Sequence, residues 1–167
     1  PCPSKLERRW TLEGYQALIK TLLASNCTPI VIGGNDAEEQ SFNFKVAEGF
    51  SSRVTNLTGS LNLTHWASLL KEADLVIAPD TGAIHLANAL GTPVVGLYAV
   101  ANPLLTGPFK NLHNSVNKFP EAVKKLESAE PRDFHHRVHD NRAMQLIEFE
   151  AVWNKVSIMI GNLRKND

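Results

Sequence analysis

Residues 75–98 read LVIAPDTGAIHLANALGTPVVGLY, and this stretch decides the fold. Its first four residues and residues 94–98 are apolar and uncharged, as expected of strands that are buried on both faces of a parallel sheet. Residues 82–90, between them, are small or apolar and have the pattern of a helix that ends at Gly91. The stretch therefore predicts a strand, a helix and a second strand joined by short turns, which is a βαβ unit.

The same alternation extends to both sides of this unit. Further strands are predicted at residues 29–32 and 54–57. Helices are predicted at residues 12–23, 36–48, 63–73, 120–126 and 148–163, the last in a closing helix region of residues 143–167. Side chains that can cap a helix precede three of them: Thr11, Asn35 or Asp36, and Asn62. The predicted fold is α/β, a Rossmann-like doubly wound parallel sheet in one domain over residues 1–167.

Charge excludes two classes of protein. The chain has 17 basic and 17 acidic side chains, and this net charge of zero argues against a general nucleic-acid binder. Residues 81–109 contain no Asp, Glu, Lys or Arg, a length that would allow a membrane span. Glycines and prolines interrupt that segment, so we interpret it as a buried centre followed by a functional loop.

The turn after the first strand of the βαβ unit carries the residues suited to chemistry. Ligands of open parallel sheets bind beyond the carboxyl ends of the strands, and a helix N-terminus there suits a phosphate. Gly82 would let an anion approach the backbone, Thr81 adds a hydroxyl, and Asp80 can accept hydrogen bonds from hydroxyls. His85 lies one turn into the helix. The alternative interpretation is a simple helix cap at Asp80 and Thr81, with His85 as a core residue.

An Asp-Thr-Gly-Ala string also occurs in retroviral-type aspartic proteases. That family is all-β, whereas the residues that follow Ala83 here have a helical pattern. The string together with its flanks, PDTGAIHLANALGTPVVGLY at residues 79–98, instead resembles the signature of glycosyltransferase family 9, the ADP-heptose:lipopolysaccharide heptosyltransferases. Other segments also resemble the family: residues 8–13 (RRWTLE), 54–59 (VTNLTG), 63–70, 102–103 and 106–109 (TGPF).

This resemblance implies a GT-B architecture, in which two Rossmann-like domains face each other across a cleft. The chain resembles only the C-terminal, donor-binding half. The family's N-terminal domain supplies the acceptor site and the catalytic carboxylate base, so this chain alone is expected to bind donor weakly and to transfer nothing. The family's C-terminal domain also begins with a strand just before the basic-x-Trp stretch. One central strand is therefore expected to be absent, leaving a sheet edge exposed.

The resemblance also implies which residues contact the nucleotide-sugar. Asp80, Thr81, Gly82, Ala83 and His85 are expected at its diphosphate and sugar. A hydroxyl and two basic side chains near the terminus are expected at the phosphates, unless they form only a solvated basic terminus: Ser4, Lys5 and Arg8. Glu38 or, equally, Glu39 is expected near the ribose or base, and both are alternatively ordinary first-turn acids of a helix.

The implied reaction is an inverting, metal-independent transfer in which this half stabilises the leaving diphosphate. No cofactor and no metal are expected, and the His-bearing residues 134–139 are expected to form a solvated loop. The implied partners are a nucleotide-sugar, ADP-heptose by resemblance, and a lipopolysaccharide core acceptor bound by the N-terminal domain. The implied location is the cytoplasmic face of the bacterial inner membrane, with peripheral association.

Two other functions remain open on the sequence. One is a sugar-nucleotide epimerase of GT-B fold, whose acid and base would be Glu38 and Glu39. The other is a catalytically silent nucleotide-sugar-binding module.

Overall fold

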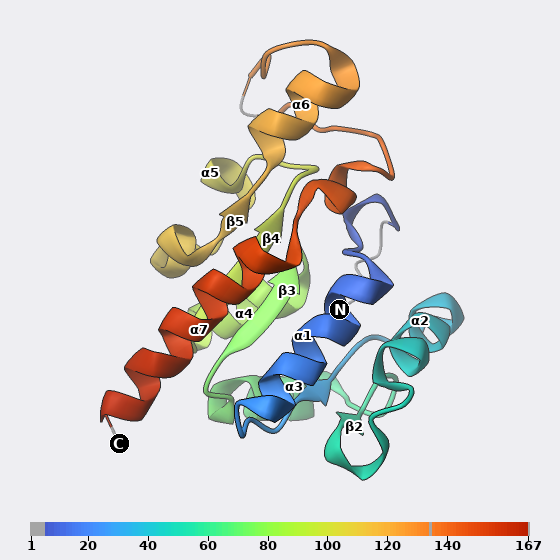
Figure 1. The fold of residues 1–167 in the computed structure, drawn as a ribbon, viewed down its shortest axis with the longest axis vertical. Helices are drawn as coiled ribbons and strands as arrows, with labels where there is room; N and C mark the ends of the chain where they lie inside the picture. Colours follow the sequence, from blue (N-terminus) through green and yellow to red (C-terminus); the bar gives the residue numbers. More distant parts are fainter. Residues whose placement is uncertain (1–5, 134, 167) are drawn as a thin grey trace.

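Parallel strands form the centre of the fold. The computed structural model describes residues 6–133 and 135–166. In it, β1 (Ile30–Val31) pairs in parallel with β2 (Thr55–Asn56). A second parallel sheet has the order β3 (Val76–Pro79), β4 (Val94–Tyr98) and β5 (Val116–Asn117). The predicted α/β fold with parallel strands is confirmed, and the strands are joined by helices as Figure 1 shows.

The helices begin at the caps that the sequence indicates. The Thr11 hydroxyl accepts a hydrogen bond from the Gly14 amide, and Asp36, rather than Asn35, caps the second helix. Asn62 caps the third. In chain order the α-helices are α1 (Leu12–Ala24), α2 (Ala37–Ala47), α3 (Leu63–Glu72), α4 (Gly82–Leu90), α5 (Pro103–Thr106), α6 (Phe119–Glu127) and α7 (Phe149–Asn166). The 3-10 helices are η1 (Leu6–Arg8), η2 (Ser51–Arg53), η3 (Phe109–Asn114) and η4 (Ala143–Leu146).

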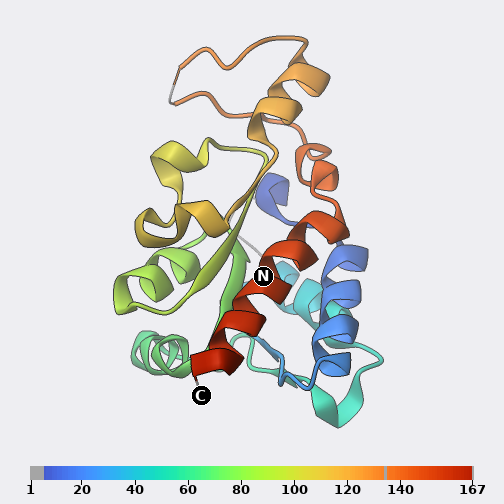
Figure 2. The same cartoon turned by 60° about the vertical axis from the view of Figure 1, so that its left-hand side comes forward.

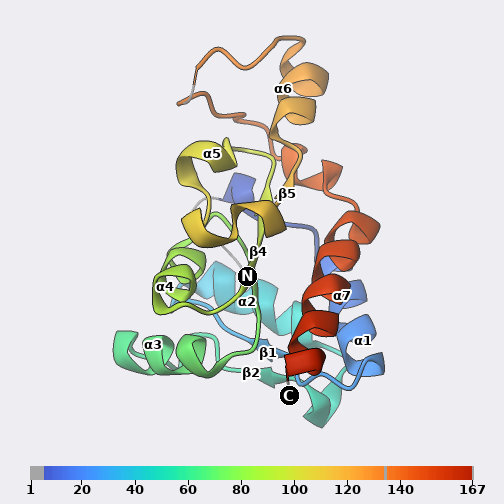
Figure 3. The same cartoon turned by 90° about the vertical axis from the view of Figure 1, so that its left-hand side faces the viewer.

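Helices cover both faces of the larger sheet. Side chains alternate along β4, so Val94 packs with α3 and α4 whereas Val95 and Leu97 pack in the core that includes α1 and α7. Figures 2 and 3 show this arrangement, with α3 and α4 on one side of the strands and α1 and α7 on the other. Every residue of β4 is buried, which is typical of the central part of a doubly wound sheet.

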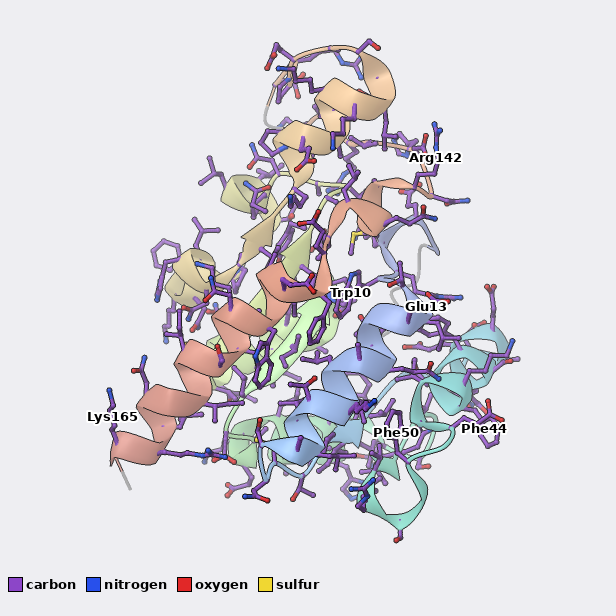
Figure 4. The ribbon with its side chains drawn as sticks, viewed as in Figure 1. Trp10, Glu13, Phe44, Phe50, Arg142 and Lys165 are labelled. Atoms are coloured by element: carbon purple, nitrogen blue, oxygen red, sulfur yellow. The ribbon has the colours of Figure 1, made fainter. Side chains whose placement is uncertain are left out.

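Trp10 ties the two ends of the described chain together. Its indole N–H donates a hydrogen bond to the carbonyl oxygen of Ile147 over 2.8 Å, and the ring packs edge-on against Tyr15. In Figure 4 it lies between α1 and the start of α7. This contact fixes the segment that leads from η1 into α1, and therefore the position of Arg8 two residues earlier.

A cavity of about 1280 Å³ separates the two sheets. It is lined by β1 and β3 and, on the covering helices, by apolar side chains such as Tyr15, Leu18 and Ile160. Within residues 6–133 and 135–166, no ladder joins β1 to β3. The facing edges of these two strands therefore border the cavity.

The second half of the chain contains more structure than the sequence indicated. The short strand β5 extends the larger sheet, and α5 and η3 occupy the loop after β4. Their few residues give no periodicity that a sequence pattern could reveal. Among the described helices, none has the length and apolarity needed to cross a membrane.

Candidate functional site

The site is built where β3 meets α4. Asp80 follows the strand directly, and Thr81 is the N-cap of α4. The Thr81 side chain makes no capping hydrogen bond, so its hydroxyl is available to a ligand. The first backbone N–H groups of a helix lack intrahelical acceptors, and here they belong to Gly82 and Ala83. Gly82 is exposed, with no heavy atom within 4 Å of the place where a Cβ would stand. This helix start can therefore receive an anion.

Asp80 lies at the centre of a cluster of charged side chains. Its Oδ1 is 3.2 Å from His85 Nε2, and its Oδ2 is 3.2 Å from Arg8 Nη1. Arg137 Nη1 lies 3.9 Å from the same Oδ2. The carboxylate is almost buried, with 10% of its side chain exposed, whereas half of the His85 side chain reaches solvent. Asp80 thus holds three side chains from different parts of the chain beside the start of α4.

The cluster carries more positive than negative charge. Two guanidinium groups share the Asp80 carboxylate, so these three side chains together carry one net positive charge, before the Glu39 carboxylate further along the cavity is counted. Arg8 Nε and Arg137 Nη1 are buried and have no hydrogen-bond partner. Burial, and to a lesser extent the charge of Asp80, raise the pKa of the nearby Tyr98 phenol, which therefore stays neutral. Unused donors and a net positive charge are what a phosphate requires.

The cavity between the sheets opens onto this cluster at one end. Arg8, Glu39, Asp80, Thr81 and His85 line that end, together with the start of α4. The remaining wall, between β1 and β3, is mainly apolar, and its charged residues, Glu72, Asp74 and Arg164, are not part of the cluster around Asp80. We therefore take the polar end, and not the cavity as a whole, as the candidate site.

The two acids of α2 take different positions. Glu38 is exposed and pairs with Arg9 across 3.3 Å. The Glu39 carboxylate lines the cavity and accepts a hydrogen bond from the Gly34 amide over 3.0 Å. Only Glu39 of this pair therefore borders the candidate site.

The structure brings together most of the residues that the sequence singled out. Asp80, Thr81, Gly82, Ala83, His85 and Arg8 surround the polar end of the cavity. Ser4 and Lys5 lie outside the described residues. Within the part of the chain that is described, no three His, Cys, Asp or Glu side chains are grouped as a metal ion would need.

The His-bearing segment was misjudged from the sequence. Phe134 is outside the described residues, but residues 135–139 are not simply a solvated loop. His136 is buried, with Nε2 at 2.6 Å from a Glu127 carboxylate oxygen, and Val138 is fully buried. The segment packs because its residues pair with the chain after β4, a long-range contact that local polarity does not reveal. As a result Arg137, which sequence reasoning missed, joins the site.

The model of glycosyltransferase family 9 (heptosyltransferase) matches residues 1–133, well over half of the chain. The chain belongs to this family. Among curated proteins, the lipopolysaccharide core heptosyltransferase OpsX of Haemophilus influenzae is 37% identical over 125 residues, which are 75% of this chain and 36% of that protein. Lipopolysaccharide heptosyltransferase 2 of Escherichia coli is 23% identical over 84% of this chain and 41% of its own length. The chain thus spans less than half the length of these relatives.

Solved structures show the same fold. Escherichia coli ADP-heptose lps heptosyltransferase II superposes with a TM-score of 0.74, at 18% identity, over 100% of this chain and 46% of that chain. Escherichia coli heptosyltransferase WaaC with ADP gives a TM-score of 0.70, at 22% identity, over 95% of this chain and 42% of that chain. The parallel α/β architecture described above is therefore that of the heptosyltransferases, which are GT-B proteins.

Proposed function

We propose that this chain is the donor-binding domain of a glycosyltransferase that adds heptose to the lipopolysaccharide core, with ADP-heptose as its donor. The observation that carries the proposal is the free start of α4, flanked by Arg8, Asp80 and His85 at the polar end of the cavity. The named activities of the relatives and the ADP in the WaaC structure support it. A second WaaC structure, 26% identical, is described with ADP-2-deoxy-2-fluoro heptose, which supports the choice of donor.

We propose a role for each part of the site. Gly82 and Ala83 would donate backbone N–H bonds to the diphosphate, and the Thr81 hydroxyl would add another. Arg8 would pair with a phosphate, and Asp80 would accept hydrogen bonds from sugar hydroxyls. His85, half exposed, would contact the same part of the donor.

Glu39 is our choice for the ribose or base, because its carboxylate borders the site whereas Glu38 pairs with Arg9 outside it. The same geometry weighs against an epimerase, which would need both carboxylates facing the sugar. We infer that the acceptor and the catalytic base belong to a second domain, and that the enzyme acts at the cytoplasmic face of the inner membrane. In the transfer, an acceptor hydroxyl attacks the anomeric carbon, and the electron pair of the broken bond stays on the departing diphosphate. The N–H groups and cations of this chain would stabilise that charge without a metal.

Titration calorimetry of the 167-residue chain with ADP, UDP and GDP tests the proposal. We expect ADP to bind most tightly of the three; in a parallel titration with ADP-heptose, Asp80→Ala should weaken binding. Thr81→Val is the variant that preserves the fold, because the Thr81 side chain makes no capping bond; it should weaken ADP binding about threefold to tenfold. Thr64→Val, at an exposed position of α3, is the matched control. If none of the three nucleotides binds, the donor site is refuted.

A further inference from the structure

The segment around Arg137 is held rigidly against the exit of β4. Ala101 and Arg137 form an antiparallel bridge, and the Val138 amide donates a hydrogen bond to the Val100 carbonyl over 2.9 Å. The neighbours of Arg137 are both buried: His136 on one side and Val138 on the other. Because successive side chains of an extended segment point to opposite faces, these two anchors direct Arg137 away from the core that holds them.

His136 strengthens this anchor through both ring nitrogens. Its Nδ1 accepts a hydrogen bond from the Arg132 amide over 3.1 Å, so Nε2 carries the proton that faces the Glu127 carboxylate at 2.6 Å. The ring also packs edge-on against Phe119 of α6. The backbone at Arg137 is thus anchored on both sides, which places its side chain beside Asp80.

The guanidinium of Arg137 has a nitrogen, Nη1, that makes no hydrogen bond in this position. Its Nη1 lies 3.9 Å from Asp80 Oδ2, which is beyond hydrogen-bond distance, and that atom is buried without a hydrogen-bond partner. Arg8 already occupies the same oxygen at 3.2 Å. Burying an unpaired donor costs free energy, so a structural ion pair alone is a poor explanation of this arrangement. An anion beside the carboxylate would supply the missing acceptor.

We propose that Arg137 binds the β-phosphate of the donor, the phosphate that carries the sugar. The inference rests on the proposed function and adds a residue to it that lies beyond the 1–133 segment matching the family. Arg137 and Arg8 approach Asp80 from different parts of the chain, so a diphosphate at the start of α4 would have a guanidinium from each. A guanidinium can donate two parallel N–H bonds to one phosphate. A β-phosphate bound by Arg137 would be the group that gains negative charge when its bond to the sugar breaks.

The test separates the two phosphates of the nucleotide. ADP and AMP are titrated by calorimetry into the 167-residue chain and into Arg137→Gln, Arg137→Lys and Arg142→Gln. Arg142 is the matched control, because it is exposed and pairs with Asp140 two residues away; Figure 4 shows it at the periphery. Thermal unfolding of each variant checks that it is folded.

We expect Arg137→Gln to weaken ADP binding about tenfold or more and AMP binding less than about threefold. Arg137→Lys should fall between wild type and Arg137→Gln, because it keeps the charge but loses the two-pronged geometry. Arg142→Gln should change neither affinity by more than about twofold. A merely structural role for Arg137 would change ADP and AMP binding equally.

The outcomes distinguish this inference from the proposed function. If wild type binds ADP and Arg137→Gln leaves the ratio of ADP to AMP affinity unchanged, the inference is wrong and the donor site stands. If wild type binds neither nucleotide, the proposed function fails, and the role of Arg137 fails with it. If Arg137→Gln does not fold, the ADP to AMP ratio of the folded Arg137→Lys variant decides.

Discussion

Two glycines at opposite ends of α4 provide a test in which stability and binding change separately. Gly82 begins the helix, and Gly91 follows its last residue with φ of +88°. An added Cβ would meet no heavy atom within 4 Å at either position. Neither substitution to Ala therefore creates a clash in the ligand-free protein. The two positions differ in two ways: Gly91 has a left-handed backbone, and Gly82 lies at the candidate site.

Gly82→Ala should leave the protein at least as stable as wild type but lower its affinity for ADP. Alanine favours a helix over glycine by up to about 1 kcal/mol in the interior, so at this first position we expect a gain of about 0.3 kcal/mol. The new methyl group, however, would keep a phosphate oxygen away from the N–H groups of Gly82 and Ala83. Losing one hydrogen bond to a charged acceptor costs about 1.5 to 3 kcal/mol, so ADP should bind at least about tenfold more weakly.

Gly91→Ala should show the reverse pattern. A residue other than glycine in the left-handed region costs about 1 kcal/mol, which lowers the melting temperature of a protein of this size by about 2 to 4 °C. Its ADP affinity should equal that of wild type, because Gly91 lies at the far end of α4. Calorimetry and thermal unfolding on the same samples measure both quantities. If Gly82→Ala binds ADP as tightly as Gly91→Ala does, no phosphate lies against the start of this helix.

Two further predictions concern stability. Trp10→Phe should lower the free energy of unfolding by about 2 kcal/mol in urea titrations, because it removes the buried hydrogen bond to Ile147 and part of a packed ring. Glu121→Gln should flatten the acid dependence of stability, because Lys118 and Lys125 lower the pKa of Glu121 to about 2 from its usual 4.5. A lowered folded-state pKa stabilises the fold above about pH 5 and loses that effect as the pH falls towards 2. Since a third of the Glu121 side chain is exposed, the contribution is below about 1 kcal/mol.

Each of these variants has a control on α7. Trp153→Phe removes a partly buried indole and should cost clearly less than Trp10→Phe; equal losses would show that the Ile147 hydrogen bond contributes nothing. Glu150→Gln removes an exposed acid. If it alters the unfolding curve between pH 5 and 2 as much as Glu121→Gln does, the pair of lysines is not responsible.

Local sequence patterns predicted the parts of the fold that depend on neighbouring residues. Thr11, Asp36 and Asn62 are caps because their side chains bond to amides two or three residues later, which the sequence displays directly. The β3–α4 turn with Asp80 and Thr81 was also predictable, because an apolar run that ends in a polar turn and a helix leaves few alternatives.

What the sequence left hidden depends on contacts between distant residues. Arg137 lies close to Asp80 because its own backbone forms an antiparallel bridge with Ala101. Nothing in the polar sequence around Arg137 indicates that bridge. The sequence also could not show whether Glu38 or Glu39 borders the candidate site. Adjacent positions on a helix differ by about 100° in direction, so the orientation of α2 against the cavity decides which acid borders the site. That orientation follows from tertiary packing.

The facing edges of β1 and β3 also affect how this chain behaves in solution. Each edge presents backbone N–H and C=O groups beside an apolar wall, a combination that acts as a template for any extended polypeptide. Association between copies, measured by light scattering, should therefore rise steeply with protein concentration. Charged side chains discourage such pairing at natural edges, yet Ile30 and Val31 on one side and Val76 to Ala78 on the other carry none. A peptide added as an extended strand between β1 and β3 could pair with both edges. It would join the two sheets into one continuous sheet.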